Sequence, residues 1–213
     1  MRHSRFPWGE LKYALWLPIY LLAFALMEQR PQTAYWATQL PLDRCIPFCE
    51  WFVLFYCAWY PLLVAVGIYL LLRDAPAFRR YMAFLAVTFF VSVFIWLLLP
   101  NGQDLRPHVF SHSNPATALI AALYRIDTNT NVFPSVHVVG AVGAAFAVWD
   151  SSRLRSRPSL RRGVVILAAL ICASTLLIKQ HTVLDVAAGL MLSALAALPI
   201  YLLPYQARVK KPA

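Results

Sequence analysis

The stretch "STLLIKQHTVLDVAAGLM", from Ser174 to Met191, places polar residues in the middle of an apolar run. Lys179, His181 and Asp185 interrupt residues that are otherwise typical of membrane-spanning helices. An ionisable group is costly to bury in lipid, so these three residues are functional candidates. A histidine that hydrogen-bonds between packed helices is the alternative. We interpret the stretch as a polar hinge between two spanning helices.

The composition of the whole chain favours a protein whose solvent is lipid. Of 213 residues, 61% are hydrophobic and 13% are charged, and the mean hydropathy is +0.61. A helix needs about 17–25 mainly apolar residues to cross a bilayer. We therefore predict an all-α, polytopic membrane protein, formed as a single domain by residues 1–213, with six transmembrane helices near residues 11–27, 49–72, 81–99, 133–150, 163–179 and 182–203.

A seventh apolar segment, residues 114–126, is too short to span the membrane. We expect it to form a short interfacial helix on the outer face, capped by Asn114. A plain packing element is the equally weighted alternative.

The net charge of +10 is distributed unevenly along the chain. Fourteen of the nineteen basic residues flank the predicted spans on one side: the N-terminus, and the segments after the second, fourth and sixth spans. By the positive-inside rule, both termini are expected to be cytoplasmic in a multi-pass protein of the plasma membrane. The basic excess indicates topology and contact with membrane lipids, and it is poor evidence for nucleic-acid binding. The oligomeric state stays open.

This topology brings three polar clusters to the outer face. They are residues 100–112, 127–137 and 179–185, which leave or enter three different spans. Within the third cluster, His181 and Asp185 are four residues apart, so on a helix they would share one face. A carboxylate on one imidazole nitrogen raises the basicity of the other, which would suit a nucleophile or general base. A polar pair that packs helices uses the same spacing.

The second cluster contains "PSVH", Pro134 to His137, where the fourth span begins. Pro134 suits the first turn of a helix, and the free N–H groups there attract anions such as phosphate. Ser135 could contribute its hydroxyl, and His137 could give a proton to a leaving group. A helix cap followed by an interfacial histidine is the alternative.

Two cations, Arg106 and Lys179, are expected on the same face. An Arg guanidinium binds a phosphoryl group through two hydrogen bonds, whereas Lys acts as a point charge. Ordinary interfacial placement with the charge reaching water is the alternative. Together these residues offer what phosphoryl transfer requires: a nucleophile, an acid, and positive charge around the transferred group.

At these residues the sequence resembles the type-2 phosphatidic acid phosphatase superfamily of integral membrane enzymes. The family signature reads Lys-x6-Arg-Pro, then Pro-Ser-Gly-His, then Ser-Arg-x5-His-x3-Asp. The counterparts are Arg106 with Pro107, the "PSVH" of residues 134–137, and Ser174 followed by His181 and Asp185. The resemblance covers roughly residue 50 to the C-terminus, with a catalytic core near residues 81–203.

The resemblance implies a metal-independent mechanism without a cofactor. His181 would attack phosphorus to form a phosphohistidine, and Asp185 would orient it. His137 would protonate the leaving oxygen and then activate the acceptor. Ser135 and Arg106 would hold the phosphoryl oxygens. The substrate would be a lipid phosphate or pyrophosphate at the extracytoplasmic face.

The chain departs from the signature at three positions. Leu99 stands where the family has Lys, Thr175 where it has Arg, and Val136 where it has Gly. We infer that Lys179 could replace one missing cation. The forms "KQHTVLDVAAG" and "NVFPSVH" resemble the branch of inositol phosphorylceramide and sphingomyelin synthases and its bacterial relatives, so a headgroup phosphotransferase is the alternative function. A non-enzymatic lipid-binding scaffold is a third.

A zinc site is an alternative here, because "HVFSH" places His108 and His112 four residues apart and His137 could be a third ligand. The preceding Pro107 does not favour a helix there. We predict no metal site, and expect His108, His112 and Asn131 to shape the outer loops or contact a lipid headgroup.

Overall fold

A computed structural model of the chain describes residues 7–30 and 34–202. The fold is mostly helical, as predicted, with seven α-helices in the described residues. They are α1 (Leu17–Glu28), α2 (Val53–Arg73), α3 (Ala75–Leu98), α4 (Pro115–Ile126), α5 (Val136–Asp150), α6 (Pro158–Leu177) and α7 (Val183–Ala197). Shorter elements are η1 (Trp8–Ala14), η2 (Pro41–Arg44), η3 (Glu50–Phe52), η4 (Ser152–Leu154), η5 (Leu198–Leu202), β1 (Trp36–Ala37) and β2 (Asn101–Gly102).

Five helical stretches in the described residues are long and apolar enough to cross a membrane. They are 8–28, 50–73, 75–98, 158–177 and 183–202. The helix at the predicted fourth span, α5, has only 15 residues, so six spans remain a prediction. Helices α3 and α6 begin several residues before the predicted spans, because arginines in their first two turns lower the hydropathy without opposing helix formation.

The short helix predicted at residues 114–126 is present as α4. The side chain of Asn114 accepts a hydrogen bond from the Thr117 N–H, which confirms it as the helix cap. Its position at a membrane interface remains a prediction. A two-residue parallel pairing of β1 with β2 was not predicted, since neither segment has an alternating pattern.

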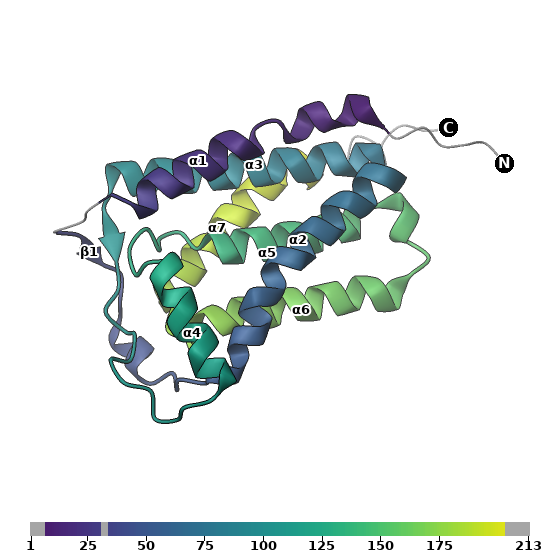
Figure 1. Ribbon diagram of the computed structural model, residues 1–213. Helices are drawn as coiled ribbons and strands as arrows, with labels where there is room; N and C mark the ends of the chain where they lie inside the picture. Colours follow the sequence, from purple (N-terminus) through teal and green to yellow (C-terminus); the bar gives the residue numbers. More distant parts are fainter. Residues whose placement is uncertain (1–6, 31–33, 203–213) are drawn as a thin grey trace.

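Helix α5 lies at the centre of the bundle and packs against α2, α3, α6 and α7 (Figure 1). Ten of its 15 residues are buried. Because most of the helix surface is buried, the hydropathy pattern of α5 does not separate an exposed face from a buried one. Gly140 and Gly143 allow the close packing: a Cβ at Gly140 would stand 2.6 Å from the Trp59 ring, and one at Gly143 would stand 2.7 Å from Phe84. By contrast, the outer surfaces of the other long helices carry exposed large apolar side chains, such as Ile19, Ile68, Phe94, Ile166 and Met191. Such a surface fits lipid.

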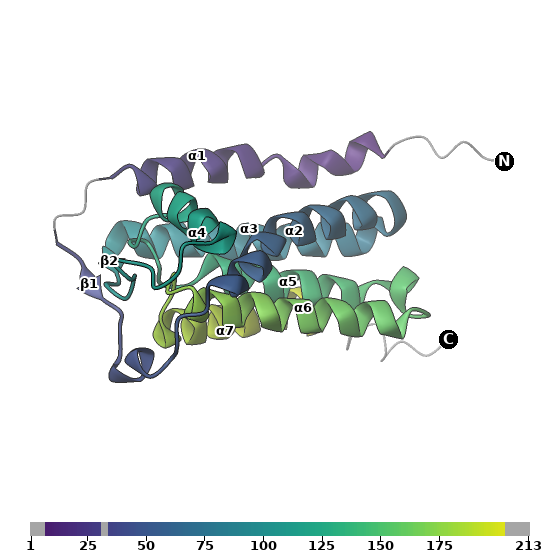
Figure 2. The ribbon, with the colours of Figure 1, turned by 60° about the horizontal axis from the view of Figure 1, so that its bottom comes forward.

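The two ends of the bundle differ in character. The turns from α2 to α3 and from α5 to α6 lie at one end, and β1, β2 and α4 lie at the other, as Figures 1 and 2 show. The first end carries the arginine-rich segments at residues 73–80 and 153–162. The second end carries all three polar clusters.

Asp74 joins the two turns at the basic end. Its carboxylate caps α3 through the Ala77 N–H (3.3 Å) and accepts hydrogen bonds from the Ser151 hydroxyl (2.9 Å) and the Ser152 N–H (3.0 Å). Burial raises the pKa of this carboxyl, but hydrogen bonds from Ser151, Ala77 and Ser152 outweigh that effect and leave the pKa below its ordinary value. Asp74 therefore contributes stability above the ordinary pKa, and this contribution is lost as the pH falls through the lowered pKa.

Replacing Asp74 by Ala is expected to lower the free energy of unfolding at neutral pH by about 2–3 kcal/mol, because a helix cap and further buried hydrogen bonds are lost. Thermal unfolding in detergent measures the change. The control is Asp104→Ala, which removes an exposed carboxylate bonded to Tyr35. The difference between Asp74→Ala and wild type should shrink at acid pH. Equal melting temperatures for the two variants at neutral pH would contradict the assignment.

Candidate active site

His137 enters the site from the start of α5. Ser135 is the N-cap, and its hydroxyl oxygen accepts from the Val138 N–H at 3.4 Å, so His137 is the second residue of the helix. Pro134 precedes the cap rather than lying in the first turn as predicted. The imidazole is 4% exposed and stacks on the Tyr56 ring of α2, with ring centroids 4.1 Å apart. The Trp59 ring, also on α2, has its centroid 4.7 Å from that of His137. The ring of His137 is thus held between α2 and α5.

His181 enters from the turn between α6 and α7. Thr182 caps α7, which begins at Val183, so His181 precedes the helix. The prediction that His181 and Asp185 share one helical face is therefore wrong. The cap itself brings the two together. Asp185 Oδ2 accepts from the Thr182 N–H at 2.7 Å and lies 3.6 Å from His181 Nδ1. Asp185 is fully buried, and its Oδ1 has no hydrogen-bond partner among the described residues.

The two histidines face one another across the junction of α5 and α7. Their ring centroids are 5.8 Å apart. The Ser135 N–H donates to the Asp185 carbonyl at 3.2 Å, which ties the two helix starts together. Gly189 permits this approach, since a Cβ there would stand 2.9 Å from Val138 Cβ. A phosphoryl group bound to one imidazole would therefore lie beside the other.

Tyr56, Asp127 and Gln180 form a polar network with His137 that no sequence motif predicted. The Tyr56 hydroxyl contacts Asp127 Oδ2, lies 3.3 Å from His137 Nδ1, and accepts from Gln180 Nε2 at 3.4 Å. Tyr56 is an isolated tyrosine in an apolar span, so no motif indicated it. Asp127 was expected only as part of the second polar cluster, residues 127–137.

Arg106 contacts this network instead of standing free. Its guanidinium donates to the Asp127 carbonyl (2.6 Å), the Tyr124 carbonyl (3.1 Å) and Gln180 Oε1. It also lies over the Tyr124 ring, 4.2 Å from the centroid. Burial lowers the pKa of Arg106, while the charge of Asp127 opposes that shift. A bound phosphoryl group would have to share Arg106 with these acceptors or displace them.

Lys179 has a different set of partners. Its backbone has φ 56°, in the left-handed region, and its ammonium donates to the carbonyl oxygens of Asp43 (2.9 Å) and Ile46 (2.5 Å). Burial lowers the pKa of this amine, and Asp43 opposes that shift. The ammonium thus joins η2 and the segment after it to the α6–α7 turn, and it bonds to these carbonyls instead of pointing to the histidine pair.

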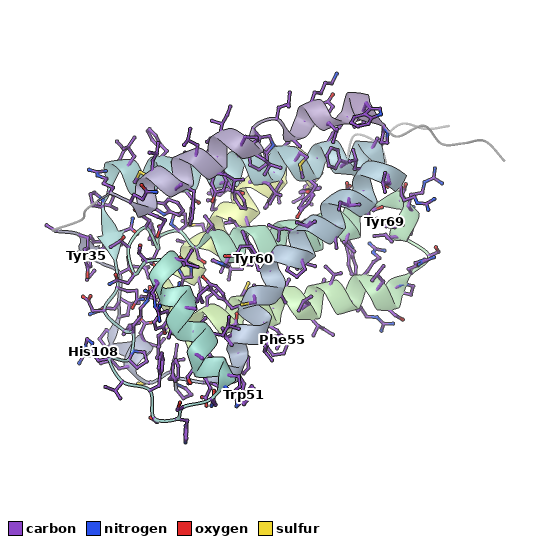
Figure 3. The ribbon with its side chains drawn as sticks, in the orientation of Figure 1. Tyr35, Trp51, Phe55, Tyr60, Tyr69 and His108 are labelled. Carbon is purple, nitrogen blue, oxygen red and sulfur yellow. The ribbon has the colours of Figure 1, made fainter. Side chains whose placement is uncertain are left out.

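The three predicted headgroup residues are not brought together with the histidine pair. His108 lies on the exposed loop at the β1 end of the molecule (Figure 3). The exposed His112 has its Nδ1 3.8 Å from Glu50 Oε1. Asn131 is buried, and its amide donates to the Met27 carbonyl (3.1 Å) and Glu28 Oε1 (3.2 Å), so it anchors the end of α1.

The described residues contain no group of three or more His, Cys, Asp or Glu side chains placed to hold a metal ion. His108, His112 and His137 are therefore not assembled as a zinc site. At two of the three positions where the family motif has a cation, this chain has Leu99 and Thr175. Leu99 is the C-cap of α3 and is 43% exposed, and the buried Thr175 donates to the Cys172 carbonyl. Neither residue supplies a positive charge.

Comparison with known families identifies the superfamily of this chain. Residues 80–208, more than half of the chain, match the family model of the PAP2 superfamily. The chain belongs to the PAP2 superfamily, the type-2 phosphatidic acid phosphatase superfamily that its motifs resemble. Members are phosphatases or phosphotransferases, so the family and the five apolar helices define an integral membrane enzyme of phosphatase type acting on phosphate esters. Searches of curated proteins and of solved structures found no match.

Proposed function

We propose that this protein removes phosphate from a lipid phosphate or pyrophosphate at the outer membrane face, through a phosphohistidine on His181. The observation that carries the proposal is the pair of buried histidines, 5.8 Å apart, with the Asp185 carboxylate 3.6 Å behind His181. Membership of the PAP2 superfamily supports the same chemistry.

The first step would form a bond between His181 Nε2 and phosphorus and break the bond from phosphorus to the lipid oxygen. His137 Nε2 would give that oxygen its proton. The Asp185 charge would stabilise the positive charge that develops on His181. In the second step, His137 would take a proton from water, and the resulting hydroxide would displace His181 from phosphorus. The N–H groups at the start of α5 and the guanidinium of Arg106 would offset the charge on the phosphoryl oxygens.

A second candidate is transfer of the phospho-headgroup to a lipid alcohol. Membership of the PAP2 superfamily supports it, because members are phosphatases or phosphotransferases. The same nucleophile and acid would serve, with the alcohol in place of water.

The test is product formation by the purified protein in detergent and EDTA, with phosphatidate, undecaprenyl pyrophosphate and a phospholipid that has an intact headgroup as substrates. Reactions in ¹⁸O-labelled water would place one heavy oxygen in the released phosphate if water is the acceptor. A lipid alcohol added to parallel reactions would yield a phospholipid product, detected by mass spectrometry, if transfer occurs. Neither product from any substrate would contradict both functions.

The proposed topology places the histidine end outside and the arginine-rich end in the cytoplasm, and the native Cys45 is a probe of it. Cys45 is exposed at the histidine end. A membrane-impermeant maleimide is expected to label it on intact cells. In a background with Cys45→Ser and Cys49→Ser, Ser156→Cys at the basic end should be labelled only after permeabilisation. The reverse pattern would overturn the proposed orientation.

A further inference from the structure

Tyr56 is the feature of the site that the family resemblance does not explain. It lies on α2, outside residues 80–208, and its side chain is fully buried. We propose that Tyr56, together with Asp127, is a positioning residue that keeps a proton on Nδ1 of His137, so that Nε2 is the atom that gives and takes the catalytic proton. This inference rests on the proposed role of His137.

The directions of the hydrogen bonds around Tyr56 follow from Arg106, whose guanidinium can only donate. A guanidinium has no acceptor, so its contact with Gln180 determines that the amide oxygen of Gln180 faces Arg106. The Gln180 amide nitrogen then faces the opposite way, and it donates to the Tyr56 hydroxyl oxygen and the Asp127 carbonyl, each at 3.4 Å.

The Tyr56 hydroxyl has one proton and two lone pairs. An ionised carboxylate can only accept, so the Tyr56 proton goes to Asp127 Oδ2. One lone pair receives the Gln180 amide. The other faces His137 Nδ1 at 3.3 Å and can only be satisfied by a proton on that nitrogen. The four groups thus allow one arrangement, in which His137 is the Nδ1–H tautomer.

Two observations connect this arrangement to the reaction. His137 Nε2, the nitrogen left without a proton in the neutral ring, is buried and has no hydrogen-bond partner among the described residues. The Tyr56 ring also stacks on the imidazole at an interplanar angle of 29°, which restrains its orientation. The Asp127 charge, acting through the Tyr56 hydroxyl, would stabilise the protonated imidazole that delivers the proton. A buried carboxylate performs this task directly in serine hydrolases.

The test is Tyr56→Phe, which removes the hydroxyl and keeps the stacked ring. We expect kcat to fall by about 10- to 100-fold with little change in KM, because the variant should lose part of the rate enhancement that general acid catalysis by His137 contributes. In ¹⁵N NMR of histidine-labelled protein, the neutral His137 should be protonated on Nδ1 in wild type and should shift toward the Nε2–H form in the variant. Comparison with His137→Asn identifies the signal.

Tyr81→Phe is the matched control. Tyr81 is also a fully buried helical tyrosine, but its hydroxyl has no hydrogen-bond partner among the described residues. This variant should keep the wild-type kcat and the wild-type His137 tautomer.

The NMR measurement separates the two proposals, because it does not require turnover. A wild-type His137 protonated on Nε2, or a tautomer unchanged by Tyr56→Phe, would overturn the role of Tyr56 even in an active phosphatase. The expected tautomers without any phosphate release or transfer would support the Tyr56 arrangement and count against the proposed function.

Discussion

Replacement of His181 by Asn is expected to abolish turnover, with a loss of at least about 10⁴-fold in kcat, because the proposed covalent intermediate forms on the His181 imidazole. Asn preserves the polar position of Nδ1. His181 Nδ1 makes no hydrogen bond in the described structure, so its removal leaves no new unpaired partner there. The melting temperature should therefore remain close to that of wild type. Phosphate release and the phosphoprotein yield, measured together, check the result.

His137→Asn separates the two steps and serves as the comparison. With a lipid-like aryl phosphate, the leaving group needs no proton, so the variant should form the phosphohistidine and then fail to hydrolyse it. The trapped phosphate should be stable to base and lost in acid, and it should disappear in the double variant with His181→Asn. Trapped phosphate that persists without His181 would refute its role as nucleophile.

Replacement of Asp185 by Asn is expected to lower kcat by about 10²- to 10⁴-fold while preserving the fold. The Asn side-chain oxygen can still accept from the Thr182 N–H, so the cap of α7 is retained. The negative charge 3.6 Å from His181 Nδ1 is lost, and with it the stabilisation of the charged imidazole. Steady-state kinetics should show the loss in kcat rather than in KM.

Asp43→Asn is the matched control for Asp185. Asp43 is also buried, and its Oδ1 accepts from the Val183 N–H at 2.7 Å, at the start of the same helix. Its carboxylate bonds to Leu40 and Val183 rather than to either histidine. This variant should lose some thermal stability and keep a kcat near that of wild type. An equal loss of kcat in both variants would indicate that Asp185 acts only by capping α7.

Local sequence patterns were sufficient to predict most of the helices. Apolar runs long enough to cross a bilayer identified α2, α3, α6 and α7 to within a few residues, and Asn114 identified the start of α4. The sequence also indicated the histidines and Asp185, because few ionisable residues interrupt such runs. These features depend on neighbours within one or two turns of the chain.

Contacts between distant segments decided the rest. The direction of the Lys179 side chain depends on carbonyl groups more than 130 residues away, at Asp43 and Ile46. The hydroxyl of Tyr56 on α2 bonds to Asp127, 71 positions later in the segment before α5, and to Gln180, 124 positions later in the α6–α7 turn. Neither arrangement has a periodic signature.

The sequence by itself therefore determined the lipid-facing helices and the chemical groups of the site. Only the tertiary structure decided which groups meet. The burial of α5 and the capping of α7 bring His137 and His181 together. Arg106 bonds to the Asp127 carbonyl within the protein. The physical reason is that burial in lipid acts on each segment separately, whereas a buried hydrogen bond forms only when two particular segments pack side by side.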